Sequence, residues 1–352
     1  MCRNIANDHT CPNKQCKHFG KFDRENVRCH SFYKTKSGRR RRYRCKSCGR
    51  TFASTTGTPY YRLKKPRRKF DEVAALTVEG VSISSIARAK GLAWNTVAHW
   101  QELASKYAKR FSDVMLTDFP LVELQADELC TFVQQKSELF WLFTTLEVWS
   151  RLWVGCIVGQ RTYRNVHSVL SDTLFRARID GRFLFTTDGF EPYKWATVRL
   201  MQSICVYGQV IKQRRNNQVS QVDRRLLIGT SAQLNEMLLN SEDSETLNTS
   251  FIERLNLTIR RGSSYLNRRT NCYARHNERL DSQVSLLRCY YNFIRPHGAL
   301  KLGSVVRTPA MQAGLTSKRL TFREIFTATE VFFLLLISWI KFRIRLNASQ
   351  RA

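Results

Sequence analysis

The sequence predicts a mixed α/β protein in which a small cysteine-rich ribbon and a helical segment precede the main domain. Two cysteine pairs near the start of the chain flank strand-like residues. A segment with helical spacing and glycine stops follows, and apolar β-rich runs then alternate with amphipathic helices. The predicted domains are a ribbon at 1–60, a helical domain at 61–112, a mixed α/β domain at 118–315 and a C-terminal tail at 316–352.

The predicted ribbon is bounded by its cysteine pairs. Cys11 and Cys16 form a C-x4-C pair, and Cys45 and Cys48 form a C-x2-C pair followed by Gly49, which permits a positive φ. Residues 33–35 and 42–44 alternate like two strands around a Ser37-Gly38 turn. Thiolates at such spacings reach one tetrahedral Zn²⁺, so we predict a structural zinc site. The C-x4-C spacing is wider than the common C-x2-C spacing, so it does not fix the second ligand of the first pair. The alternatives to Cys16 are His18, Cys29 and His30.

Three helices are predicted after the ribbon. Residues 70–76 have helical spacing that stops at Gly80, residues 82–91 follow a serine cap, and a third helix begins around Trp94. This is the pattern of a helix-turn-helix, whose last helix enters the major groove of DNA. The side chains expected to face the bases are Asn95, Thr96, His99 and Gln101. An ordinary three-helix packing unit is the alternative.

The charge of the chain predicts a polyanionic partner. With 58 Lys and Arg against 28 Asp and Glu, the formal net charge is +30 over 352 residues. Like charges in a compact chain repel one another, so we expect double-stranded DNA as the partner, and the charge disfavours an acidic small-molecule enzyme. Basic runs at 34–50, 62–69 and 260–279 contain or flank aromatic and apolar residues, which favours DNA contact over a solvated face. The DNA-binding residues predicted are Arg41, Arg42, Lys64, Lys65, Arg67, Arg68, Asn95, Thr96, Arg260 and Arg261.

A cytoplasmic, nucleoid-associated location is expected. The N-terminal residues lack an apolar signal segment, and in a reducing compartment eleven cysteines do not form a disulfide framework. The apolar run at 331–340 is half the length of about twenty residues that a membrane span needs. We therefore expect no membrane partner.

The middle of the chain predicts a mixed sheet. Strands are expected at 121–127, 138–148, 152–158, 182–187 and 203–211, with helices at 164–177 and 192–201. A three-strand meander followed by β-α-β places the first and fourth strands side by side, which is the arrangement of a ribonuclease-H-like sheet.

Three acidic residues lie at positions where they can converge. Asp127 lies on or just past the first strand, Asp188 ends the fourth, and Glu253 begins a helix predicted at 251–260. Such oxygen ligands suit Mg²⁺ or Mn²⁺, and two metal ions can assist phosphoryl transfer. Each acid also has a structural interpretation: Asp188-Gly189 as a turn, Ser250 to Glu253 as a capping box, and Asp127 as a surface residue.

The order of these motifs resembles the DDE transposases of bacterial insertion sequences, most closely the family typified by the first-named insertion sequence. The matching stretches are Ala126-Asp127-Glu128, Thr187-Asp188-Gly189 and the E-R-x-N-x-x-x-R pattern of 253–260. Residues 43–52 resemble the zinc ribbon of such proteins, and residues 291–300 and 307–310 resemble their C-terminal segment. The apolar tail after Thr327 has no counterpart.

The resemblance implies a ribonuclease-H-like catalytic domain that uses Mg²⁺ or Mn²⁺ and a homo-oligomer assembled on DNA. It assigns Asp127, Asp188 and Glu253 as catalytic metal ligands, with Asn256 and Arg260 orienting Glu253 or contacting DNA. The expected activity is a DNA transposase that binds terminal inverted repeats and catalyses strand cleavage and transfer. Two alternatives stay open: a DNA-binding regulator or domesticated transposase without catalysis, and a nuclease that cuts without strand transfer.

Overall fold

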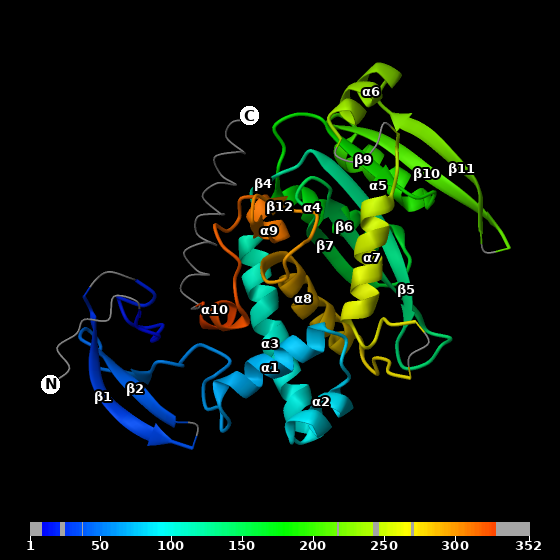
Figure 1. Cartoon of the computed structure of the whole chain (residues 1–352). Coiled ribbons are helices and arrows are strands. Elements are labelled where there is room, and N and C mark those ends of the chain that lie inside the picture. Colours follow the sequence, from blue (N-terminus) through cyan, green and yellow to red (C-terminus); the bar gives the residue numbers. More distant parts are fainter. Residues whose placement is uncertain are drawn as a thin grey trace. The chain divides into compact units, whose positions relative to one another are not determined.

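The computed structural model describes residues 9–21, 25–36, 38–216, 218–241, 246–268 and 271–328. The chain divides into two compact units, shown in Figure 1. The first comprises residues 1–76, 86–114 and 321–352, and the second comprises residues 77–85 and 115–320. The expected apolar run at 331–340 and the turn residue Ser37 lie outside the described residues.

The first unit begins with a three-stranded antiparallel ribbon. Its strands are β1 (Val27–Thr35), β2 (Gly38–Cys45) and β3 (Thr51–Ala53), paired in the order β1-β2-β3. Val27 and Tyr43 are its buried apolar residues, and Phe52 packs against them. A core this small contributes little folding free energy, so such a ribbon depends on an additional constraint such as a metal.

Three helices follow the ribbon, as the glycine stops predict. They are α1 (Arg67–Val78), α2 (Ile83–Lys90) and α3 (Trp94–Met115). Gly80 and Gly91 have φ of 75° and 60°, and the Ser85 N–H donates to Ser82 Oγ at 3.2 Å. α3 continues to Met115 because a buried stripe runs along it through Ala108 and Phe111.

An aromatic cluster joins α10 (Phe322–Thr327) to the helices of the first unit. The Phe326 ring lies 5.5 Å from Phe70 and 6.2 Å from Tyr60, and Phe70 lies 5.5 Å from Trp100. Asp71 accepts hydrogen bonds from the Tyr60 hydroxyl and from the Arg323 guanidinium. Part of the C-terminal tail is therefore an integral element of this unit.

The second unit is built around a six-stranded mixed sheet. Its strand order is β11-β10-β9-β5-β6-β7, in which β5, β9 and β10 are parallel neighbours and the remaining pairs are antiparallel. The strands are β5 (Glu123–Phe132), β6 (Leu139–Glu147), β7 (Leu152–Gly159), β9 (Phe183–Thr187), β10 (Cys205–Arg215) and β11 (Gln218–Ile228). β11 is a strand that the sequence analysis did not predict.

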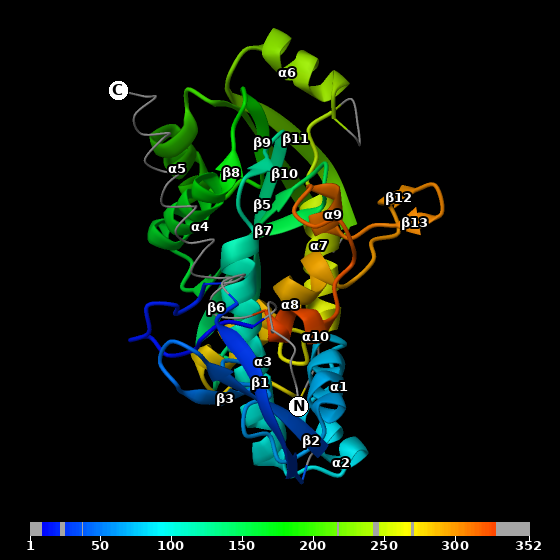
Figure 2. The same ribbon diagram turned by 90° about the vertical axis from the view of Figure 1, so that its left-hand side faces the viewer.

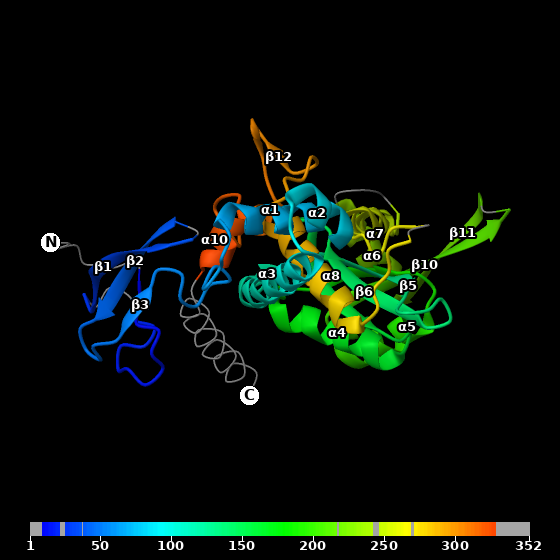
Figure 3. The same cartoon turned by 90° about the horizontal axis from the view of Figure 1, so that it is seen from below.

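Helices cover the sheet on both sides, which explains the apolar runs of its central strands. α4 (Tyr163–Arg176) and α5 (Glu191–Met201) lie on one side and α7 (Ser250–Gly262) on the other, as Figures 2 and 3 show. α8 (Asn277–Phe293) protects the edge of β7, where the Asn292 amide bonds both backbone groups of Trp153. The remaining elements are α6 (Ser231–Leu239), α9 (Pro309–Gln312), β4 (Phe119–Pro120), β8 (Ala177–Arg178), β12 (Lys301–Leu302) and β13 (Val305–Val306).

Candidate metal centres

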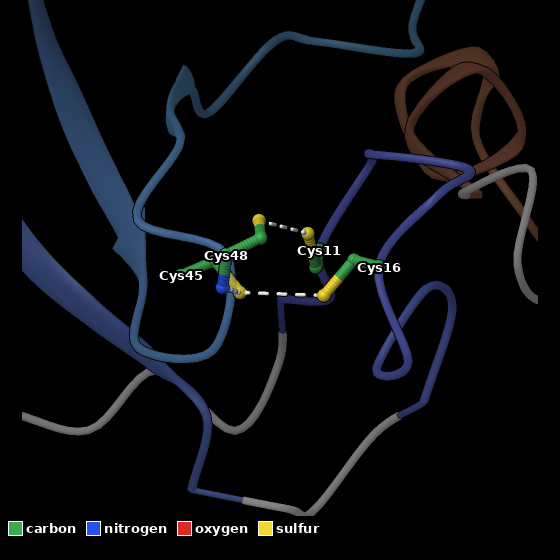
Figure 4. Close-up of side chains that lie close together, drawn as sticks. All are labelled: Cys11, Cys16, Cys45 and Cys48. Atoms are coloured by element: carbon green, nitrogen blue, oxygen red, sulfur yellow. Dashed lines mark hydrogen bonds between the residues drawn. The ribbon is translucent and has the colours of Figure 1, made fainter.

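The four cysteines of the ribbon converge on one point, as Figure 4 shows. Their sulfur atoms all lie within 4.8 Å of one another, with 3.6 Å between Cys11 and Cys48 and 3.7 Å between Cys16 and Cys45. A zinc ion about 2.3 Å from four tetrahedral sulfurs sets them roughly 3.8 Å apart. The cluster therefore has the donor set and the spacing of a structural zinc site.

The surroundings of the cysteines suit bound thiolates. Gly49 has the positive φ, 69°, that the knuckle turn requires. Cys45 Sγ accepts from the Asn26 amide at 3.1 Å and from the Cys48 N–H at 3.4 Å. The backbone N–H of Arg50 lowers the pKa of Cys48 to about 6, whereas burial raises the pKa of Cys11 above its ordinary value.

The alternative ligands lie outside this cluster. Of the described histidines and cysteines near the ribbon, His18, Cys29 and His30 contribute no atom to the four-sulfur group. His30 instead contacts Ser31 Oγ at 3.1 Å. Cys16 is therefore the cysteine that completes the first pair.

The second candidate centre lies where β5 and β9 run side by side. Gln125 on β5 and Thr186 on β9 are register partners, and Asp127 and Asp188 each follow two residues later. Parallel strands in register project equivalent residues to the same place, so the two carboxylates meet. Oxygen atoms of Asp127, Glu128 and Asp188 all lie within 4.8 Å of one another.

Asp127 is held by the sheet and by α7. Its Oδ2 accepts from Asn256 Nδ2 at 2.7 Å, and its Oδ1 accepts from the Glu128 N–H at 2.8 Å. Burial, reinforced by the charges of Glu128 and Asp188, raises the pKa of Asp127 to about 7. Asp127 is thus not a solvated surface residue. The resemblance implied that Asn256 orients Glu253 or contacts DNA, but in the structure Asn256 orients Asp127.

Glu128 also belongs to this carboxylate group, although it is not among the three metal ligands expected from the sequence. Its side chain is 2% exposed and forms an ion pair with Arg161, which is also positioned over the rings of Trp141 and Phe190. Burial and the charge of Asp188 raise the pKa of Glu128. Its Oε2 is buried and forms no hydrogen bond of standard geometry with the described residues, although the Tyr193 hydroxyl is near enough to affect that pKa. The sequence feature that could have indicated Glu128 is that two consecutive acids, Asp127 and Glu128, lie in one apolar strand.

Glu253 is paired with a cation instead of joining the three carboxylates. Its Oε1 accepts from Lys212 on β10 and, at 2.7 Å, from Thr249 Oγ1. α7 begins at Ser250 with Thr249 as its N-cap and without a side-chain capping bond. The capping-box interpretation of Ser250 to Glu253 is therefore wrong, because Thr249 is the N-cap and the Glu253 carboxylate accepts from the Thr249 hydroxyl and from Lys212 instead of from a backbone N–H at the helix start.

All four acids line one cavity of about 1040 Å³ in the second unit. Glu253, Asn256, Leu257 and Arg260 reach it together because residues three or four apart share one face of α7. Asp188 Oδ1 accepts from the Phe190 N–H at 3.0 Å, so this acid both lines the cavity and closes a turn. Hard divalent cations prefer such carboxylate oxygens, and these residues fit one chemically.

The predicted DNA-binding cations have different surroundings. Arg41, Arg42, Lys64, Lys65, Arg68 and Arg261 are exposed, whereas Arg67 and Arg260 are half-buried. The guanidinium of Arg260 donates to the carbonyls of Leu266 and Cys130, which makes it part of the cavity wall. In α3, Asn95 is exposed and Thr96 is half-buried.

One residue expected to face DNA bases is buried. Gln101 is 8% exposed, because it lies on the stripe of α3 that also buries Val97 and Ala108. The helical period places every third or fourth residue on this stripe, so Gln101 cannot face a ligand while Asn95 and His99 remain exposed.

Within the described residues, no helix is both long enough and apolar enough to cross a membrane. Comparison of the chain with protein-family models and with curated proteins finds no match.

Proposed function

We propose that this chain is a DNA transposase whose carboxylate-lined cavity performs metal-dependent strand cleavage and strand transfer. The observation that carries the proposal is the proximity of Asp127, within β5, to Asp188, which directly follows the neighbouring parallel strand β9. The order β7-β6-β5-β9-β10 within the sheet is the meander plus parallel crossover expected of a ribonuclease-H-like domain, and it supports the same interpretation.

The charge distribution supports a nucleic-acid substrate. In a chain with a net charge of +30, five acids line one cavity, namely Asp127, Glu128, Asp188, Glu191 and Glu253, and Lys212, Arg260 and Arg268 line it too. Carboxylates alone would repel a phosphate, but together with divalent cations they favour its binding. We infer that the basic side chains hold the DNA backbone while Asp127, Glu128 and Asp188 hold Mg²⁺ or Mn²⁺.

The residues of the cavity have separable roles in this proposal. Bound divalent cations would supply charge neutralisation and activation of an attacking oxygen. Asn256 fixes the Asp127 carboxylate, Arg161 fixes Glu128, and the Phe190 N–H fixes Asp188. Glu253 lines the cavity from α7 and is available once Lys212 moves to a phosphate.

The first unit would recognise the ends of the element. A zinc-bound ribbon with exposed Arg41 and Arg42, followed by three helices, provides basic surface and a helix for the major groove. More than one protomer would act on paired ends. These roles follow from the charge and the resemblance of the motifs.

The test is a strand-transfer assay of the full-length protein on duplexes that carry the inverted repeats flanking the gene, with Mg²⁺ or Mn²⁺. We expect wild-type protein to join these ends to a target duplex and Asp188→Asn to lose the activity. Asp180→Asn is the matched control, because Asp180 is an exposed partner of Arg178 outside the cavity. Equal products from wild type and Asp188→Asn would refute the carboxylate assignment.

A DNA-binding regulator is the second candidate, favoured by the ion pair that keeps Glu253 out of the three-carboxylate group. It predicts sequence-specific duplex binding that Asp188→Asn leaves unchanged. It also predicts no joined or cleaved product with either metal. The same assay therefore separates the two candidates.

A further inference from the structure

The hairpin of β10 and β11 extends past the rest of the sheet. The register between the two strands runs from Tyr207 and Ile228 to Arg215 and Gln218 at the tip. β10 pairs with β9 only as far as Gln209, so beyond that residue β11 is its strand partner. Figures 1 and 3 show the resulting two-stranded ribbon projecting from the second unit.

The two faces of this ribbon differ in chemistry. One face is apolar near its base, where Val210 and Val222 pack in a cluster with Leu247. The opposite face carries polar side chains that alternate along both strands and are exposed in the structure. Its members are Gln213, Arg215, Gln218 and Gln221.

An internal carboxylate orients two of these amides. Asp223 accepts from Gln213 Nε2 at 3.2 Å and from Gln221 Nε2 at 2.6 Å. Asp223 is the single acid between residues 210 and 228, against five Lys and Arg. Amides held in place on a cationic ribbon are pre-organised for contacts with a polyanion, because less side-chain freedom is lost on binding.

The ribbon is continuous with the carboxylate cavity. Ile211 and Lys212 line the cavity from β10, next to the point where the polar face begins. A duplex lying along the ribbon would therefore pass beside the carboxylates. This position distinguishes the hairpin from the basic runs recognised in the sequence.

We propose, on the basis of the DNA-directed function above, that the β10–β11 hairpin is a sequence-reading element that enters the major groove beside the cavity. That groove is about 12 Å wide and admits a two-stranded ribbon, and Gln and Arg are the side chains that read adenine and guanine there. The hairpin sets which base pairs lie next to the reacting phosphate.

The test uses full-length protein and a pool of random-sequence DNA duplexes. Wild type, the hairpin variant Arg215→Ala/Gln218→Ala and the control Arg199→Ala/Gln202→Ala each select bound duplexes. Arg199 and Gln202 are exposed at the end of α5 and do not line the cavity, so the control removes the same side chains elsewhere. Thermal unfolding verifies that all three proteins are folded.

We expect wild type and control to enrich the same sequence. The hairpin variant should enrich a shorter sequence and bind the wild-type duplex about tenfold more weakly, since each base contact discriminates by roughly that factor. Arg215→Lys keeps the charge but not the bidentate geometry, so it should lose preference while keeping non-specific binding.

Three other results of this selection experiment would overturn the inference. If the hairpin variant enriches the wild-type sequence with unchanged affinity, the inference is overturned and the DNA-directed function stands. If wild type binds no duplex, both the inference about the hairpin and the proposed DNA-directed function are overturned. If the variant loses only self-association, measured by sedimentation, or only RNA binding, the hairpin has another partner and the inference is overturned.

Discussion

Asp127 in β5 and Asp188, the residue that follows β9, each lie two residues beyond the register pair of Gln125 and Thr186 on these parallel strands. Strand pairing therefore brings the two carboxylates close together, and both line the cavity of the second unit. Burial is the largest cause that raises the pKa of Asp127 to about 7, and the charges of Glu128 and Asp188 raise it further.

The ionised Asp127 carboxylate should lower the free energy of unfolding at high pH. Its folded-state pKa of about 7 exceeds the ordinary 3.8, so the folded protein binds this proton more tightly than the unfolded chain. The cost is absent below the ordinary pKa, grows as pH rises, and is complete above about pH 7. We expect Asp127→Asn to raise the free energy of unfolding by about 1–3 kcal/mol near pH 8 and little near pH 4.

Denaturant titrations at the two pH values, without added metal, measure this difference. Asp180→Asn, which changes an exposed acid outside the cavity, should have no such pH dependence. An equal effect of Asp127→Asn at both pH values would contradict the electrostatic origin of the raised pKa.

Lys212 should compete with a cation for Glu253. Replacing it in Lys212→Met removes one positive charge from the cavity and releases the Glu253 carboxylate from its ion pair. We expect Mn²⁺ to bind about tenfold more tightly, a change of roughly 1.4 kcal/mol. Titration followed by electron paramagnetic resonance measures the affinity, and Lys301→Met removes an exposed charge outside the cavity as control. Unchanged affinity would mean that Glu253 contributes nothing to metal binding.

The four-cysteine cluster should hold one zinc ion per chain. Cys45→Ser should remove it, because Cys45 is fully buried and its sulfur lies beside that of Cys16. Cys29→Ser is the matched control, since Cys29 lies on β1 outside the cluster. Metal analysis gives the stoichiometry, and a chelator should lower the thermal stability of wild type and control alike. Retention of zinc by Cys45→Ser would exclude this ligand set.

Arg161 should stabilise the fold chiefly by neutralising Glu128. Arg161→Ala leaves an almost fully buried carboxylate without its partner, which costs about 3 kcal/mol in comparable buried pairs. Adding Glu128→Gln should recover most of that loss. Unfolding free energies of the two single variants and the double variant give the coupling, and additive effects would show that the ring contacts of Arg161 dominate.

Much of the local structure could be predicted because it depends on neighbours along the chain. Glycines at 80 and 91 end helices, a serine caps α2, and the cysteine pairs bracket a ribbon. Alternation and apolar runs located five strands of the sheet. β11 was not predicted because its many polar residues hide the alternation of apolar and polar positions that marks a strand. A two-stranded ribbon exposed on one face also lacks the apolar run of a buried strand.

The pattern of residues alone determined that this is a mixed α/β chain with a four-cysteine cluster, a strongly basic surface and acids at the ends of predicted strands. Tertiary structure alone decided which side chains meet. Glu128 joins the carboxylates, Asn256 binds Asp127, Glu253 pairs with Lys212, and Gln101 is buried. Helix ends and strand alternation reflect short-range energies, whereas these contacts join segments far apart in sequence and exist only once strand register and helix packing are set.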